Sequence, residues 1–303
     1  MNHLNENSPQ KSIAEFLHAI LKQSATPTAQ QWLHEKLNSI NTNFSIRHFF
    51  IAFSAAFRFF GKEEISFTNA ELETANRLCH GWNPNGIRAY EMARLIIFLH
   101  LPTTEKTTYF ETVNKLFNAA DMGELVSLYK SLIVYPYAED YQRRTAEGIR
   151  TNIKNVFEAI ALNNPYPAKY LDERQWNQLV LKSVFNGSPL YRIIGLEQRA
   201  NATLSQQLSD YAHERWAAGR TVNPELWRAA APFANEKLIQ DYQKLFNSEN
   251  NFDRQAAALA CVQSQHPQAL ELVNQYPELK NAIDNNSLTW DNFSIAWYHS
   301  LIQ

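Results

Sequence analysis

Apolar side chains recur every three or four residues along most of the chain, and this spacing places them on one face of an α-helix. Leu204, Leu208 and Tyr211 follow it in one segment, and residues 149–160 follow it in another. Alternating runs of β-branched residues, which are typical of strands, are hard to find. The pattern therefore predicts an all-α protein in which each helix buries a single face.

Capping signals divide this pattern into many short helices. Thr68 followed by Glu71 forms a capping box, because the hydroxyl and the carboxylate each satisfy a free amide of the first turn. Asn-Pro pairs at 83–84 and 223–224 place a capping residue before a proline that needs no amide hydrogen there. The predicted helices span 10–24, 28–41, 44–60, 68–80, 84–100, 104–119, 122–134, 139–162, 172–186, 201–219, 224–231, 235–247, 252–265, 267–275, 277–285 and 290–301.

The number of short helices and their brief connections favour a right-handed α-superhelix of stacked helix pairs, as in HEAT or armadillo repeats. No strict repeat period is visible, and an irregular globular helical bundle is the alternative. We expect a single helical domain over residues 1–303. Its one candidate subdivision lies near 163–170, where the segment NNPYPAKY carries two prolines that force an extended path.

The composition fits a folded helical chain and argues against several functional classes. The 303 residues are 45% hydrophobic and 19% charged, which supplies a core and excludes extensive disorder. The eight glycines are scattered singly, so phosphate-binding loops and dinucleotide folds are not expected. The net charge of -2, without a long basic run, argues against nucleic acid as a partner.

The sequence carries no recognised catalytic or metal-binding motif. His34 and His213 are each followed by a glutamate, but the second histidine of a zinc-protease motif is missing after both. The sequence also lacks a GxSxG nucleophile motif and a phosphate-binding lysine motif. We therefore expect no metal and no other cofactor, and we favour a protein that is not an enzyme. A motif-free active site stays open as the alternative.

The chain shows neither an export signal nor a membrane span. Its first residues, MNHLNENSPQK, lack the charged segment followed by an apolar one that a signal peptide requires. The most apolar stretch, from Phe49 to Phe57, is about half as long as a membrane span needs. These features predict a soluble cytoplasmic protein.

Arginines inside an apolar helix are the first candidates for ligand binding. Arg47, Ser54 and Arg58 lie at intervals of seven and four residues, so they share one stripe of their helix. The stripe is either a solvated edge or a small anionic site, since guanidinium groups bind carboxylate and phosphate through paired hydrogen bonds.

Asn152 and Arg215 are candidates because each continues a predicted apolar stripe. Asn152 falls within the stripe of residues 149–160 and needs hydrogen-bond partners if it is buried. Arg215 extends the stripe of residues 204–211, where a guanidinium is costly to bury without a carboxylate or a backbone carbonyl as its partner. For both residues we favour a structural role over contact with a ligand.

Glu197 and Glu214 are the carboxylates considered as partners of Arg215. The full set of candidate ligand-binding residues is Arg47, Arg58, Asn152, Arg199, His213, Glu214 and Arg215.

Several long segments resemble the EboA-domain family and occur in the family's order. They cover roughly residues 82–233, about half of the chain. Long matches in order are more specific than one short motif. The segments are GELVSLYKSL from Gly123, EGIRTNIKNVFEAIALNNPYP from Glu147, WNQLVLKSVF from Trp176, PLYRIIGLEQRAN from Pro189 and YAHERWAAGRTVNPELWR from Tyr211.

The resemblance implies a place in a bacterial gene cluster for metabolite synthesis and traffic toward the periplasm. The other products of that cluster resemble a membrane prenyltransferase, a dehydroquinate synthase, a TIM-barrel isomerase and metal-dependent hydrolases. The resemblance brings no catalytic residues to this chain. It implies a cytoplasmic accessory or scaffold protein that delivers a precursor and whose partners are other products of the cluster, the membrane prenyltransferase among them. The alternative is an enzyme or carrier for a small anionic metabolite, cyclitol-like or prenylated.

Overall fold

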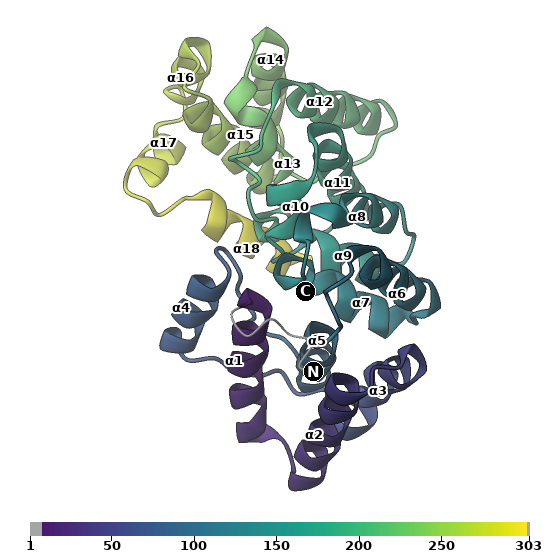
Figure 1. The fold of residues 1–303 in the computed structure, drawn as a ribbon. Coiled ribbons are helices and arrows are strands. Elements are labelled where there is room, and N and C mark those ends of the chain that lie inside the picture. The colour runs from purple at the N-terminus through teal and green to yellow at the C-terminus, as the bar shows by residue number, and fades with distance from the viewer. Residues whose placement is uncertain (1–7, 302–303) are drawn as a thin grey trace. The chain divides into compact units, whose positions relative to one another are not determined.

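The computed structural model describes residues 8–301, and within this part of the chain every regular element is helical (Figure 1). The all-α prediction is confirmed, while the superhelix of stacked pairs stays a prediction. The first ten α-helices are α1 (Pro9–Ser24), α2 (Pro27–Thr42), α3 (Ile46–Phe59), α4 (Asn69–Leu78), α5 (Ala89–Leu99), α6 (Lys106–Ala119), α7 (Met122–Lys130), α8 (Gln142–Ile149), α9 (Lys154–Ala161) and α10 (Tyr166–Tyr170).

Eight further α-helices and four short 3₁₀ helices complete the described chain. The α-helices are α11 (Glu173–Asn186), α12 (Ala202–Ala217), α13 (Leu226–Ala230), α14 (Glu236–Phe246), α15 (Asn251–Ser264), α16 (Pro267–Val273), α17 (Pro277–Asp284) and α18 (Trp290–Ser300). The 3₁₀ helices are η1 (Leu132–Val134), η2 (Ala138–Tyr141), η3 (Leu190–Arg192) and η4 (Ala231–Phe233).

The chain contacts group into two compact units, which are described separately. Within the described residues, unit 1 comprises 8–160 and 164–166, and unit 2 comprises 161–163 and 167–301. The chain passes between the units within the NNPYPAKY segment. Part of this segment was predicted to be extended, but its second half forms α10. Pro167 is tolerated there because it lies in the first turn, where no amide hydrogen is needed.

Unit 1 is built around α5, which is buried over its whole length. Helices α1, α2, α3 and α7 pack against it, as expected for a helix that is apolar on all sides. Two charged residues of α5 are buried with it, Glu91 and Arg94. Each has partners: Glu91 accepts a hydrogen bond from Lys130 Nζ at 3.0 Å, and Arg94 donates to the carbonyl of Phe53 at 3.2 Å.

Unit 2 is built around α15, whose alanines allow other helices to approach closely. Ala256, Ala257, Ala258 and Ala260 are fully buried. Helices α13, α14, α16 and α18 contact this helix. Because alanine has a small side chain and the best helix propensity, one helix can pack against several neighbours.

Two predicted helices differ from the structure more than the others do. The helix expected over 84–100 begins at Ala89, because Asn83 Oδ1 accepts the amide of Asn85 and Gly86 takes a φ of +78° to close a turn. The helix expected over 139–162 is divided into η2, α8 and α9. In the break between α8 and α9, Thr151 Oγ1 accepts the amide of Ile153, and such a bond competes with helix formation.

Candidate functional site

One face of α6 carries four side chains that line a cleft in unit 1. Lys106, Phe110, Asn114 and Asn118 follow one another at four-residue intervals, so they lie one above the next along the helix. Val113, beside them, is buried. The face therefore presents a lysine at one end, two amides at the other and an apolar surface between them.

The opposite wall comes from η2 and from α8. Asp140 and Tyr141 lie in η2, and Arg143, Arg144 and Glu147 lie in the first two turns of α8. These five residues and those of α6 enclose a cavity of about 410 Å³. All the residues of both walls fall in unit 1, so the cleft belongs to that unit alone.

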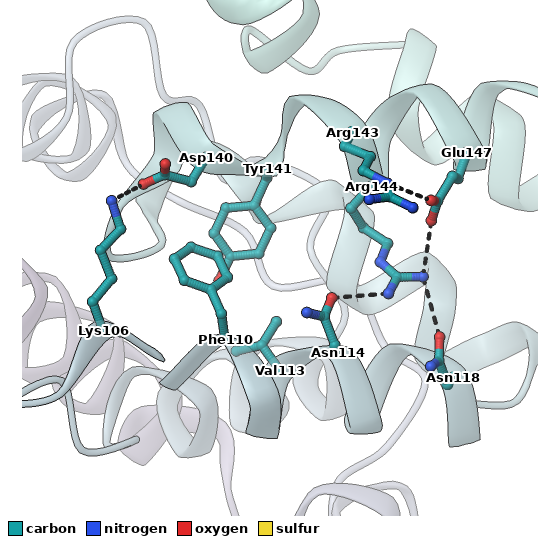
Figure 2. Close-up of a pocket in the computed structure, with 10 residues that line it drawn as sticks. All are labelled: Lys106, Phe110, Val113, Asn114, Asn118, Asp140, Tyr141, Arg143, Arg144 and Glu147. Carbon is teal, nitrogen blue, oxygen red and sulfur yellow. Dashed lines mark hydrogen bonds and ion pairs between the residues drawn. The ribbon is translucent and has the colours of Figure 1, made fainter. Parts of the chain in front are cut away.

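The cleft has two charged ends (Figure 2). At one end Lys106 Nζ lies 2.6 Å from Asp140 Oδ2. At the other end the Arg144 guanidinium contacts Glu147 at 3.2 Å and donates hydrogen bonds to Asn114 Oδ1 at 2.9 Å and Asn118 Oδ1 at 3.2 Å. Arg144 is thus held by three partners.

The charged ends differ in how firmly they are held. The hydrogen bond to Asp140 raises the pKa of the Lys106 ammonium above its ordinary value, so this lysine stays charged. Arg143 contacts Glu147 at 3.3 Å, and its side chain is 93% exposed. With such exposure Arg143 is the cation most free to turn toward a bound ligand. Three cations against two carboxylates leave the cleft with an excess of one positive charge.

An aromatic floor joins the two ends. Phe110 and Tyr141 lie between them in Figure 2, and their ring centroids are 5.3 Å apart. Tyr141 is buried, and its hydroxyl lies 2.7 Å from that of Tyr109. Rings at such a floor provide apolar contact for the body of a ligand, while the amides and charges bind its polar groups.

The side chains of the cleft offer charges, amides and aromatic rings for binding a ligand. None of the described residues that line it is a serine, cysteine or histidine. Both carboxylates already accept from a cation, and a carboxylate so paired is a poor proton acceptor. The arrangement therefore suits an anionic group near Arg143 and Arg144 and a polar group near Lys106.

None of the seven residues predicted as ligand contacts lines this cleft. Arg47 and Arg58 lie on α3, where both are exposed. Within residues 8–301 neither guanidinium has a hydrogen-bond or ion-pair partner. The two share one stripe of the helix, as predicted.

Asn152 was expected on a buried apolar stripe, and this placement is wrong. It lies in the break between α8 and α9 and is exposed. Ile153, which was expected on the same stripe, is 42% exposed. The predicted stripe assumed one continuous helix, and the turn at Thr151 to Ile153 rotates this segment out of register.

Arg199 has a well-defined structural environment in unit 2. Its Nη1 donates to the carbonyl oxygens of Pro167 at 2.9 Å and Ala168 at 3.2 Å, near the end of α10. The guanidinium carbon lies 4.8 Å from the centroid of the Trp176 ring. Burial lowers the pKa of Arg199, and the stacked, hydrogen-bonded geometry compensates for its desolvation.

His213, Glu214 and Arg215 lie near the end of α12. His213 Nε2 is 2.6 Å from Oδ1 of the buried Asp241, and Glu214 is exposed. Arg215 was expected to be buried, with a carboxylate or a backbone carbonyl as its partner. It is only half-buried, and its Nε donates to the carbonyl of Thr221 at 3.0 Å. The helix ends two residues later, so no further packed turn covers the side chain.

Glu197, which was considered as a partner of Arg215, pairs with a different arginine. Its Oε1 accepts from Arg228 Nε at 2.7 Å. Both residues lie in the segment that resembles the EboA family, but their contact joins positions 31 residues apart. Local sequence could not choose between the two arginines.

Sequence analysis missed the buried acids of unit 2. Glu225 is fully buried and accepts the amides of Leu190 at 2.8 Å and Tyr191 at 2.6 Å. Burial raises the pKa of Glu225 above its ordinary value. Asp241 is buried, and it accepts from Ser209 at 2.9 Å as well as lying beside His213. The Asn-Pro-Glu turn was a signal for Glu225, but its partners lie far away in sequence.

No group of three or more histidine, cysteine, aspartate or glutamate side chains within residues 8–301 is placed to hold a metal ion. Over the same residues, no helix combines the length and apolar character needed to cross a bilayer.

Comparison with known proteins identifies the family. The family described as "Metabolite traffic protein EboA" matches residues 13–231 of the 303-residue chain, and this range contains the whole cleft. No curated protein and no solved structure matches the chain. The match spans well over half of the sequence, and it agrees with the ordered segments from Gly123 to Arg228. The chain belongs to the EboA family of metabolite traffic proteins.

Proposed function

We propose that this chain is a non-catalytic accessory protein of metabolite traffic that binds a small anionic metabolite in the cleft between α6 and α8. One observation carries the proposal: Lys106, Arg143 and Arg144 converge with two asparagines on a cavity of about 410 Å³. A cavity of this size holds a small metabolite rather than a polymer. A binding role also fits the lack of a nucleophile among the described residues of the lining.

The shape of the cleft suggests a ligand with a ring and an anionic group. The rings of Phe110 and Tyr141 form the floor for an alicyclic body. Arg143 and Arg144 offer charge-assisted hydrogen bonds to a carboxylate or phosphate. Asp140, together with the amides of Asn114 and Asn118, suits hydroxyl groups. A charged cyclitol meets all three requirements.

The family description supports a place for this binding step in metabolite traffic. We propose that the chain acts in the cytoplasm, where it receives a precursor from one protein of its gene cluster and delivers it to another, ultimately toward the periplasm. The membrane prenyltransferase of the cluster is one proposed partner. A pull-down with tagged chain against the other cluster products tests these contacts, and recovery of none of them contradicts the delivery role.

Calorimetric titration of the purified full chain tests the ligand class. Suitable probes are myo-inositol 1-phosphate, quinate, uncharged myo-inositol and inorganic phosphate. We expect the two charged cyclitols to bind at least about tenfold more tightly than myo-inositol, because a charge-assisted hydrogen bond contributes about 1.5–3 kcal/mol. Equal affinity for charged and uncharged cyclitols contradicts an anionic ligand.

Matched variants connect any binding to this cleft. Lys106→Gln and Arg143→Gln each remove one cation of the lining, and we expect each to weaken binding of the charged probes by about tenfold. Lys115→Gln and Arg150→Gln are the controls, because both residues are exposed and neither lines the cavity. If the controls weaken binding as much as the cleft variants, the ligand binds elsewhere or through net charge alone.

A further inference from the structure

Helix α3 exposes apolar and basic side chains on the same face. Arg47, Ile51, Ser54 and Arg58 follow one another at intervals of four, three and four residues, so they form one stripe. Ile51 is 52% exposed, and Phe57, beside the stripe, is 46% exposed. Large apolar side chains this exposed mark an interaction surface when they gather on one face.

The charge on this face is of one sign. Residues 46–59 contain no aspartate or glutamate. Arg47 and Arg58 have no ionic or hydrogen-bonded partner within residues 8–301. Lys62, just beyond the helix, places its Nζ 5.3 Å from the centroid of the Phe57 ring. The nearest carboxylates in sequence are Glu63 and Glu64, which lie beyond the end of the helix and leave its stripe uncompensated.

The separation of the two arginines decides what kind of anion they suit. Eleven residues separate them, which is about 16 Å along the axis at 1.5 Å per residue. Guanidiniums that start this far apart along the helix favour a set of anions over the single small anion that was one of the two alternatives from the sequence. An extended array of anions can contact both. Exposed Ile51, between the arginines, and Phe57 add apolar contact to such an array.

We propose that α3 is a peripheral membrane-binding helix whose Arg47–Arg58 stripe contacts anionic phospholipid headgroups. A helix lying at a membrane surface places its apolar side chains at the boundary with the acyl chains and its basic side chains among the headgroups. The mixture of exposed isoleucine and phenylalanine with unpaired arginine fits a lipid surface better than an acidic protein, which offers no acyl boundary. The surface lies on a different helix from the α6–α8 cleft, so this inference is independent of the proposed ligand.

Vesicle flotation of the full chain tests the proposal. We expect the chain to float with phosphatidylcholine vesicles that contain phosphatidylglycerol. With vesicles of phosphatidylcholine alone, we expect the chain to remain in the bottom fraction. Binding falls as salt rises, because salt screens the headgroup charge. The Arg47→Gln/Arg58→Gln variant is expected to bind about twenty-five-fold more weakly, at about fivefold per arginine. Ile51→Ser weakens binding further at every salt concentration, because it removes apolar contact.

The control variant is Arg150→Gln/Arg220→Gln, which changes the net charge equally at two exposed positions outside α3. If this control variant loses as much vesicle binding as the α3 variant, the proposal is wrong. It is also wrong if the wild-type chain does not bind anionic vesicles. Two further measurements would reveal a different partner at the α3 face. Gel filtration that shows a dimer for the wild-type chain and a monomer for the α3 variant assigns the face to a second copy. Tight binding of polyglutamate without vesicle binding assigns it to an acidic protein.

Discussion

The hydroxyl oxygens of Tyr109 and Tyr141 lie 2.7 Å apart in the interior of unit 1. Both side chains are buried, and burial raises the pKa of each above the ordinary value of a tyrosine. The pair therefore stays neutral and hydrogen-bonded under conditions in which exposed tyrosines ionise. Because Tyr141 also borders the α6–α8 cleft, this bond fixes the ring that packs against Phe110 at the floor of the cleft.

Tyr141→Phe should lower the free energy of unfolding by about 1–3 kcal/mol, because it leaves the buried hydroxyl of Tyr109 without its partner. The ring remains, so binding of a charged cyclitol should change by less than about twofold. Urea unfolding and calorimetric titration measure the two effects. An unchanged unfolding midpoint would show that the hydroxyl pair contributes nothing to stability.

Gly148 and Gly123 should respond in opposite ways to substitution by alanine. A Cβ on Gly148 would lie 2.6 Å from both Ile160 Cδ1 and Tyr129 Cζ, so Gly148→Ala overpacks unit 1 and should cost about 1–3 kcal/mol. A Cβ on Gly123 meets nothing closer than 3.5 Å. Gly123→Ala should therefore be neutral or stabilising by up to about 1 kcal/mol through helix propensity. Thermal unfolding of both variants checks the difference in sign.

Glu225→Ala should lower the free energy of unfolding by about 3 kcal/mol, because the buried amides of Leu190 and Tyr191 lose their acceptor. Glu225→Gln keeps one carbonyl oxygen at the site, and its cost should be smaller. Glu249→Ala, at an exposed position, is the control and should change stability by less than about 0.5 kcal/mol. Equal unfolding midpoints for all three variants would show that Glu225 does not contribute to the stability of unit 2.

Arg199 and Arg215 should differ in their contribution to stability. Arg199→Ala removes two hydrogen bonds to backbone carbonyls and the contact with Trp176, and it should cost about 2 kcal/mol. Arg215→Ala removes one hydrogen bond from a half-exposed side chain, and it should cost less than about 1 kcal/mol. Urea unfolding ranks the two. A loss of about 3–5 kcal/mol at Arg215 would instead indicate a buried ion pair.

His100 should make stability depend on pH below neutrality. Burial lowers the pKa of His100 below its ordinary 6.5, so the unfolded chain binds a proton before the folded chain does. The neutral His100 therefore stabilises the folded chain fully above pH 6.5, and this stabilisation is lost as the pH falls toward the lowered pKa. The urea unfolding midpoint should decrease as the pH is lowered from 7.5 to 5.5. This decrease should be smaller for the His100→Gln variant. If the midpoints of the wild-type chain and the His100→Gln variant change equally with pH, His100 is not a source of the pH dependence.

The helices could be predicted from sequence because their signals are local. The capping box of Thr68 and Glu71 forms as expected, and Asp121 and Glu124 form another. Each depends on residues three positions apart, which a sequence displays directly. The prediction failed where a side chain competed with the helix, as Thr151 does between α8 and α9.

The cleft could be predicted only in part. Lys106, Phe110, Asn114 and Asn118 show their common face in their four-residue spacing. Nothing local showed that this face meets Arg144, which lies 30 residues from Asn114 and 26 from Asn118. The same spacing also occurs on solvated helix faces, so periodicity alone could not distinguish a lined cavity from a surface.

The sequence by itself determined the helical class, the approximate helix bounds and the family, because caps, apolar periodicity and ordered segments are all properties of neighbouring residues. Only the tertiary structure decided which polar side chains are paired. Glu225 accepts hydrogen bonds from amides some 35 residues away. Glu197 accepts a hydrogen bond from Arg228 and not from Arg215. Burial and long-range contact set the partner of a charge, and both depend on how helices distant in sequence pack together.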